Sequence, residues 1–242
     1  MLFNETSISL KYKKIENLKK TYFVNEEILK KHFNEATVLP IPDEAPFDVP
    51  RIMVKTIHEH AQLNISPIAA TFHVAYNDGF ERNWDTCKEY ICERMNSVFD
   101  FLNLMTDNDY EYIGVVSNII VDDIQKEGAR LLSNNLLKRK LDNIFDINIK
   151  YTFVEEKNMF VNIMLQNARL FKDGVNVDNA GELNLENQKK ESIGAIIDIN
   201  DRYGFNNDKN YKTSSEMLGK LLDKMSEIID DKLMPLIERG EY

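Results

Sequence analysis

Hydrophobic residues recur along this chain with two different periods, which divide it into expected strands and helices. Polar and apolar positions alternate over Ser7–Lys13 and Ile147–Phe153, and this is the period of a strand. The run 110–121 is apolar at nearly every position, which is typical of a strand buried on both faces. Further strands are predicted at 51–56, 62–66, 68–76, 161–165 and 193–199.

Apolar residues at steps of three and four predict three long helices, over 81–104, 128–141 and 213–239. A short helix is expected after Asn25, which suits an N-cap. Thr213 and Glu216 have the spacing of a capping box, and Pro235 is expected to bend or loosen the last turn of its helix.

Two kinds of segment join these elements. The stretch 39–50 holds four of the chain's six prolines, so we expect a stiff, extended connector. The stretches 172–190 and 201–212 are polar, and the first is expected to form a mobile loop.

Strands followed by one long helix occur in both halves of the chain. The pattern predicts an α+β fold in which one or more antiparallel sheets carry long helices packed on one face. We expect a single domain over 1–242, and the pattern leaves open two similar ββ(β)α halves, about 1–142 and 143–242.

Charge and composition narrow the classes of partner. Thirty Lys and Arg against forty Asp and Glu give a net charge of −10, which argues against a nucleic-acid partner. No apolar window has the length of a membrane helix, and no signal peptide is visible. Lysines gather in the N-terminal segment between Lys11 and Lys31, whereas 173–242 is acidic, so self-association or an oppositely charged partner is an alternative to a solvated surface.

The two cysteines indicate a reducing compartment. Cys87 and Cys92 lie five positions apart in an expected helix, about 140° out of phase, so they should not bridge each other. Unpaired thiols fit the cytoplasm. Small core residues are the favoured interpretation of both, ahead of redox chemistry.

Familiar catalytic motifs are absent from the sequence. It contains no phosphate-binding loop, no dinucleotide fingerprint, no serine-hydrolase elbow and no zinc-protease motif. We therefore assign no catalytic residue and expect no cofactor.

Three groups of residues have the chemistry of a metal site. His58, His60 and His73 could hold zinc across a hairpin, although exposed turn histidines are the favoured interpretation. Asp146, Glu155 and Lys157 are similar to the carboxylate and lysine set of magnesium-dependent nucleases, but a solvated charged turn is favoured. Metal content is left unknown.

The third group comprises Asp198, Asn200 and Asp201, which follow a strand and have the oxygen ligands of a cation site. Local capping of backbone donors is favoured there. Trp84, the single tryptophan, is expected to anchor the core rather than to form an interface hot spot.

The chain resembles a sporadically distributed family of uncharacterised bacterial proteins of about this length. The resemblance rests on Val49-Pro50-Arg51, Ile65-Ser66-Pro67 and the Trp84 helix, and covers about residues 38–123. It implies no established activity. The strands-then-helix halves are also similar in topology to the export chaperone SecB, which is an analogy of fold alone.

These observations favour a non-enzymatic, cytoplasmic protein that binds another polypeptide or itself, in a chaperone-like or defence-system accessory role. The alternative is a metal-dependent hydrolase or nuclease that uses Asp146, Glu155, Asp198 or Asp201. A ligand sensor with a pocket between sheet and helices is a third hypothesis.

Overall fold

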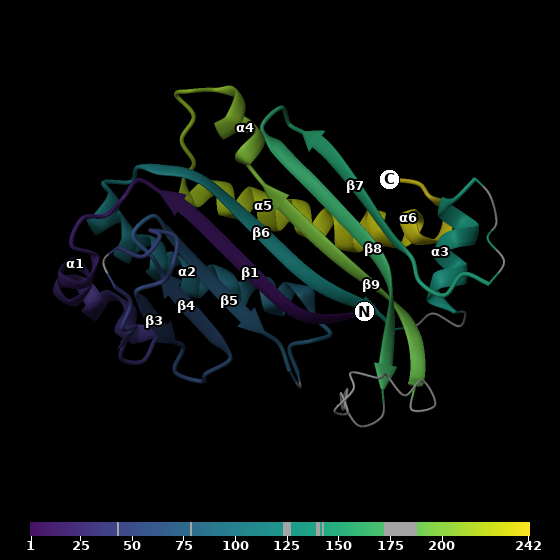
Figure 1. Cartoon of the computed structure of the whole chain (residues 1–242), viewed down its shortest axis with the longest axis horizontal. Coiled ribbons are helices and arrows are strands. Elements are labelled where there is room, and N and C mark those ends of the chain that lie inside the picture. The colour runs from purple at the N-terminus through teal and green to yellow at the C-terminus, as the bar shows by residue number, and fades with distance from the viewer. Residues whose placement is uncertain (43, 78, 123–126, 139–140, 142, 172–187) are drawn as a thin grey trace.

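All strands of the described chain belong to one antiparallel sheet (Figure 1). The computed structural model describes residues 1–242 except 43, 78, 123–126, 139–140, 142 and 172–187. The strand order is β2-β3-β4-β5-β1-β6-β9-β8-β7. The strands are β1 (Leu2–Tyr12), β2 (Thr37–Val38), β3 (Ile52–Lys55), β4 (Ala61–Ile65), β5 (Ala69–Ala75), β6 (Tyr110–Val121), β7 (Asn148–Glu155), β8 (Met159–Phe171) and β9 (Gln188–Asn200).

Helices precede, separate and follow these strands. The predicted α+β class with an antiparallel sheet is confirmed. The helices are α1 (Leu18–Asn25), a 3-10 helix (Glu26–Lys31), α2 (Trp84–Thr106), α3 (Gly128–Leu136), α4 (Arg202–Asn207), α5 (Ser215–Glu227), a π-helical turn (Ile228–Lys232) and α6 (Leu233–Arg239).

The strand order repeats about the centre of the sheet. From β1 the sheet continues outward through β5, β4 and β3, and from β6 it continues through β9, β8 and β7. Each set is one strand, a crossover, a three-strand meander and then a long helix, α2 or α5. The second set begins at Tyr110, so this repeat divides the chain before β6 rather than near residue 142.

The long helices α2 and α5 lie behind the sheet in Figure 1. Alternate residues of each strand point to them, as Ile8, Val115 and Ile197 do, and these three are fully buried. Trp84 joins the two halves on this side: its ring lies 5.4 Å from that of Phe3, and its Nε1 donates to Ser226 Oγ of α5 at 2.9 Å. Trp84 is 5% exposed, in agreement with its expected role as a core anchor.

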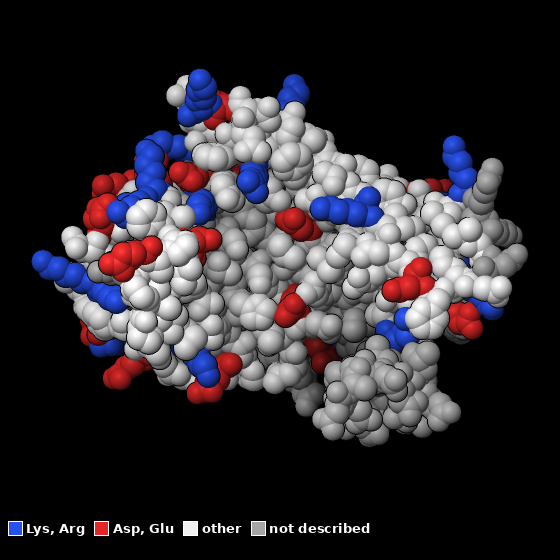
Figure 2. Space-filling view, viewed as in Figure 1, with Lys and Arg blue, Asp and Glu red and all other residues white. Residues whose placement is uncertain are grey.

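The opposite face of the sheet is covered by α4 at one corner. The Phe205 and Tyr203 rings contact those of Tyr112 and Phe160, which alternate with buried residues on β6 and β8. We call the face that bears Tyr112 and Phe160 the open face, because the long helices pack on the other one. It faces the viewer in Figures 1 and 2.

Several helix boundaries differ from the sequence prediction. The short helix begins at Leu18 and ends at Asn25, and the predicted segment after Asn25 is 3-10 instead. The helix predicted over 128–141 ends at Leu136. The polar stretch 201–212 contains α4, and of the predicted loop 172–190 the part 172–187 lies outside the described residues.

The long C-terminal helix is interrupted before Pro235, rather than in its last turn, where the sequence predicts the effect of the proline. Pro235 has no N–H to donate, and the turn before it, Ile228–Lys232, is π-helical, with Leu233 N–H donating to Ile228 O. The predicted capping box is wrong. The N-cap of α5 is Ser214, whose side chain makes no capping bond, and Thr213 pairs with Tyr110 in an isolated bridge.

Candidate functional site

Strand β7 forms an eight-residue edge of the sheet. It pairs with β8 alone, with Tyr151 opposite Ile163. Just before β7, Asn167 N–H donates to Ile147 O. Because hydrogen-bonded and non-hydrogen-bonded pairs alternate along an antiparallel ladder, the odd-numbered residues of β7 are the ones whose backbone groups bond to β8. The N–H and C=O groups at the even positions therefore point away from the sheet, and those positions are Asn148, Lys150, Thr152 and Val154.

The other edge of the sheet is short. Strand β2 has only two residues, Thr37 and Val38. The proline-rich connector, residues 39–50, follows it directly. Short edge strands and proline both discourage the addition of a further strand. The two edges therefore differ, and β7 is the edge that offers a continuous row of backbone donors and acceptors.

Aromatic side chains line β7 on the helix side of the sheet. The Tyr151 and Phe153 rings are stacked 6.2 Å apart, and Phe153 stacks on Tyr242 at 4.0 Å with an interplanar angle of 5°. Tyr151 and Phe153 are half-buried, and Tyr242 is 38% exposed. We call Ile149, Tyr151, Phe153 and Tyr242 the aromatic shelf, because apolar surface remains accessible along the edge.

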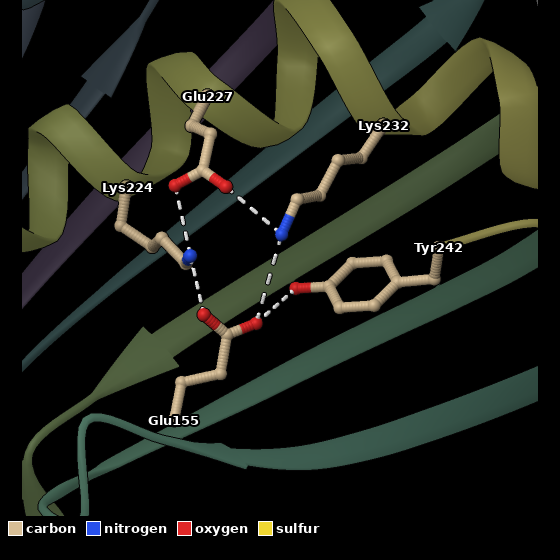
Figure 3. A network of polar contacts seen from close by, with 5 residues as sticks. All are labelled: Glu155, Lys224, Glu227, Lys232 and Tyr242. Carbon is tan, nitrogen blue, oxygen red and sulfur yellow. Dashed lines mark hydrogen bonds and ion pairs between the residues drawn. The ribbon is translucent and has the colours of Figure 1, made fainter.

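A polar network holds the end of β7 against the C-terminal helices (Figure 3). The carboxylate of Glu155 accepts hydrogen bonds from Lys224 Nζ and, at 2.6 Å, from Tyr242 Oη. Glu227 binds Lys224 at 2.8 Å and Lys232 at 2.9 Å, and Lys232 lies 4.0 Å from Glu155. Two carboxylates and two ammonium groups thus alternate around a closed ring of contacts.

This arrangement shifts the pKa of each acidic member downward. Burial alone would raise the pKa of Glu155, but the bonds from Lys224 and Tyr242 outweigh it and hold that pKa below its usual value. Bonds from Lys224 and Lys232 lower the pKa of Glu227. Both carboxylates are ionised at neutral pH, so the network anchors β7 in an ordered conformation before any partner binds.

The open face carries few charged side chains over the middle of the sheet (Figure 2). One polar group there crosses from β1 to β5: His73 Nδ1 lies 2.8 Å from Ser7 Oγ, and His73 Nε2 lies 3.5 Å from Glu5. Serine, histidine and glutamate in contact resemble a catalytic triad. The neighbouring backbone N–H groups belong to the sheet ladder, however, so they are not aimed at an oxyanion.

The structure places His73 on the strand that faces the His60 end of β4, as the zinc hypothesis expects, but it does not gather the three histidines into a metal-binding group. His58 and His60 are exposed in the turn between β3 and β4, and His73 lies in the middle of β5 opposite Gln62 and Ser7. Among the residues described, no three His, Cys, Asp or Glu side chains gather into a metal-binding group. Cys87 and Cys92 are both free thiols.

The carboxylates of the hydrolase hypothesis also occupy different surroundings. Asp146 is exposed before β7 and accepts from the Ile147 N–H, and Lys157 lies in the turn after Glu155. Glu155 is engaged by two lysines, whereas the favoured interpretation from sequence was a solvated turn. Asp198 accepts from Asn162 and Asn200 on the open face.

Asp201 is a buried structural carboxylate. Its side chain is fully buried, accepts from Ile113 N–H at 2.7 Å and accepts from Tyr211 Oη at 2.9 Å. Capping of backbone donors was the favoured interpretation of this group, and Asp201 does cap one, although on β6 rather than locally. Desolvation raises its pKa.

No local sequence signal marks the other members of the β7 site. Lys224, Glu227 and Lys232 lie on the polar side of a predicted helix, where charged residues are ordinary. Tyr242 lies far from β7 in sequence. The two lysines and the tyrosine come into contact with Glu155 only because the C-terminal helices pack across the end of β7.

Comparison with known proteins adds no family: no family model matches the chain, and no curated protein matches it. None of the described helices combines the length and the apolar character needed to cross a bilayer.

Proposed function

We propose that this protein is a non-enzymatic, chaperone-like binder of extended polypeptides, which it holds as a tenth strand along β7. The observation that supports this proposal is the edge itself: eight residues whose outward backbone groups pair with no other described strand. Strand addition satisfies such groups with main-chain hydrogen bonds, which give affinity for many sequences.

The side chains of β7 select the chemistry of the bound segment. Every second residue of an added strand would lie beside the aromatic shelf, so apolar residues at alternate positions are favoured. On the open face the exposed Lys150 favours an acidic or neutral neighbour. The expected ligand is an extended, amphipathic segment without a run of lysine or arginine.

A different polypeptide is a better occupant than a second copy of this chain. Antiparallel pairing of two β7 edges would bring two Lys150 side chains to the same face within a few residues of each other. An edge lysine is one of the devices that prevent such pairing. We therefore propose a heterologous partner, and self-association is an outcome to be tested.

The compartment and the chaperone-like topology belong to the same proposal. The two free thiols support a reducing compartment, the cytoplasm. The repeated strand order, with one long helix after each meander, supports the SecB-like analogy of topology. No observation in the described residues favours the hydrolase or nuclease alternative.

A proline on the outer side of β7 tests the proposal. Thr152 N–H points outward, so Thr152→Pro removes a donor for the partner while leaving the ladder to β8 intact. The probe is a fluorescein-labelled dodecapeptide with valine or tyrosine at alternate positions and serine or glutamate between them. We expect its dissociation constant, measured by fluorescence anisotropy, to rise about tenfold or more, the equivalent of one lost hydrogen bond with added steric conflict.

Two controls make the test specific. Thr152→Val also loses the 2.9 Å bond from Thr152 Oγ1 to Asn162 but keeps the backbone N–H, and it should bind the peptide as the wild type does. A peptide N-methylated at alternate positions cannot donate to the edge and should bind neither protein. Equal binding by Thr152→Pro and wild type would contradict the proposal. It would also be contradicted if the wild type formed a dimer without peptide and Thr152→Pro did not, because β7 would then pair with a second copy of the chain.

A further inference from the structure

We infer that a cleft at the opposite end of the sheet from β7 binds a small molecule that carries a phosphate group. The cleft is open, has a volume of about 510 Å³, and lies between the start of α1 and the proline-rich connector. This size suits a ligand as large as a mononucleotide. In Figure 1, α1 lies at the left end of the molecule and β7 lies toward the right.

The charge that lines this cleft opposes the charge of the whole chain. Four of its lining residues are basic, namely Lys14, Lys19, Lys20 and Arg51, and one is acidic, Glu16. Lys14 and Glu16 pair with each other at 2.9 Å, so three cations remain. In a protein of net charge −10, such a concentration of positive charge inside a cleft favours a small anion.

Arg51 is the buried member of this group. It is 5% exposed, and its guanidinium donates to Val49 O at 2.7 Å and to Ala45 O at 3.0 Å. No carboxylate of the described residues lies within ion-pair distance of it. A buried cation without a counter-charge is costly, and an anion in the cleft would offset that cost.

The first turn of α1 adds directional donors. Its N-cap, Asn17, has left-handed φ and ψ angles of 54° and 40° and makes no side-chain capping bond. The N–H groups of Leu18, Lys19 and Lys20 precede the first intrahelical bond, which Thr21 N–H makes to Asn17 O. These three residues line the cleft, so the N-terminal turn of α1 and its two lysines border the same volume.

The remaining wall of the cleft is apolar. Phe47 is 46% exposed, and Lys14 Nζ lies 4.5 Å from the centre of its ring. The connector that carries Phe47 is held in place by the hydrogen bonds from Arg51. A phosphorylated molecule with an aromatic or apolar portion fits both walls.

Titration calorimetry with adenosine monophosphate, inorganic phosphate and adenosine tests the inference on the full chain. We expect adenosine monophosphate to bind more tightly than phosphate, and adenosine not to bind. The double variant Lys19→Gln with Lys20→Gln should weaken binding of the nucleotide about tenfold or more, since each lysine contributes a charge-assisted hydrogen bond.

A control variant removes the same charge elsewhere. Lys209→Gln with Lys220→Gln changes two exposed lysines of the second half and should bind adenosine monophosphate as the wild type does. Absence of binding to all three probes would overturn the inference. Equal loss of affinity in both double variants, or binding of an RNA oligonucleotide without binding of the monophosphate, would also overturn it.

Discussion

Replacing Trp84 with alanine is expected to lower the free energy of unfolding by about 3–5 kcal/mol. The side chain begins α2, packs on Phe3 of β1 and donates to Ser226 of α5. Its loss would open a cavity where the two halves of the fold meet. Trp84 is the only tryptophan, so the variant has no tryptophan fluorescence to report unfolding. Urea unfolding should therefore be followed by far-ultraviolet circular dichroism.

The matched variant Trp84→Phe separates packing from hydrogen bonding. Phenylalanine retains most of the ring contact with Phe3 and loses the donor to Ser226, whose hydroxyl still donates to Leu222 O at 3.1 Å. We expect it to cost about 1–2 kcal/mol. If Trp84→Ala cost less than Trp84→Phe, Trp84 would not be packed between the two halves of the fold.

Replacing Asp201 with alanine is expected to cost about 2–4 kcal/mol, because the Ile113 N–H and the Tyr211 hydroxyl both lose their buried acceptor. Asp201→Asn keeps an oxygen for Ile113 and can donate to Tyr211, so it should remain within about 1 kcal/mol of the wild type. Urea unfolding at pH 7 measures both differences.

The same pair of proteins predicts a pH dependence. Burial raises the pKa of Asp201 in the folded state above its usual value of 3.8. The unfolded state therefore loses this proton first, and the wild type loses stability relative to Asp201→Asn as pH rises from 3.8 through the folded pKa. A difference in stability that stays constant between pH 3 and pH 7 would contradict the raised pKa.

Elements with a strong local pattern could be predicted from the sequence. Tyr110–Val121 matches the predicted strand at both ends, and α2 differs from its prediction by three residues at the start and two at the end. The first strand begins at Leu2, whereas the prediction began it at Ser7. The prediction missed the first residues because Asn4, Glu5 and Thr6 interrupt the alternation of polar and apolar positions, and a register shift in the pairing with β6 occurs at the same place. Local patterns set element type, and irregular pairing sets the ends.

The arrangement of the elements could not be predicted in the same way. Pairing of β1 with β6 joins residues more than a hundred positions apart, such as Ile8 and Val115, and nothing local specifies it. The free edge of β7 is a consequence of that order. Glu155 shows the same limit for the site. Its place beside a turn predicts a solvated carboxylate, whereas the packing of α5 brings Lys224 into an ion pair with it.

Hydrogen exchange measured by NMR at single residues tests strand addition most directly. In the free protein the outward amides of Lys150 and Thr152 should exchange rapidly, and the amides of Tyr151 and Phe153, which pair with β8, should exchange slowly. With the alternating dodecapeptide bound, we expect exchange at Lys150 and Thr152 to slow at least about tenfold, as for amides in a ladder. Unchanged exchange at these two amides in the complex, or protection confined to another strand, would contradict strand addition at β7.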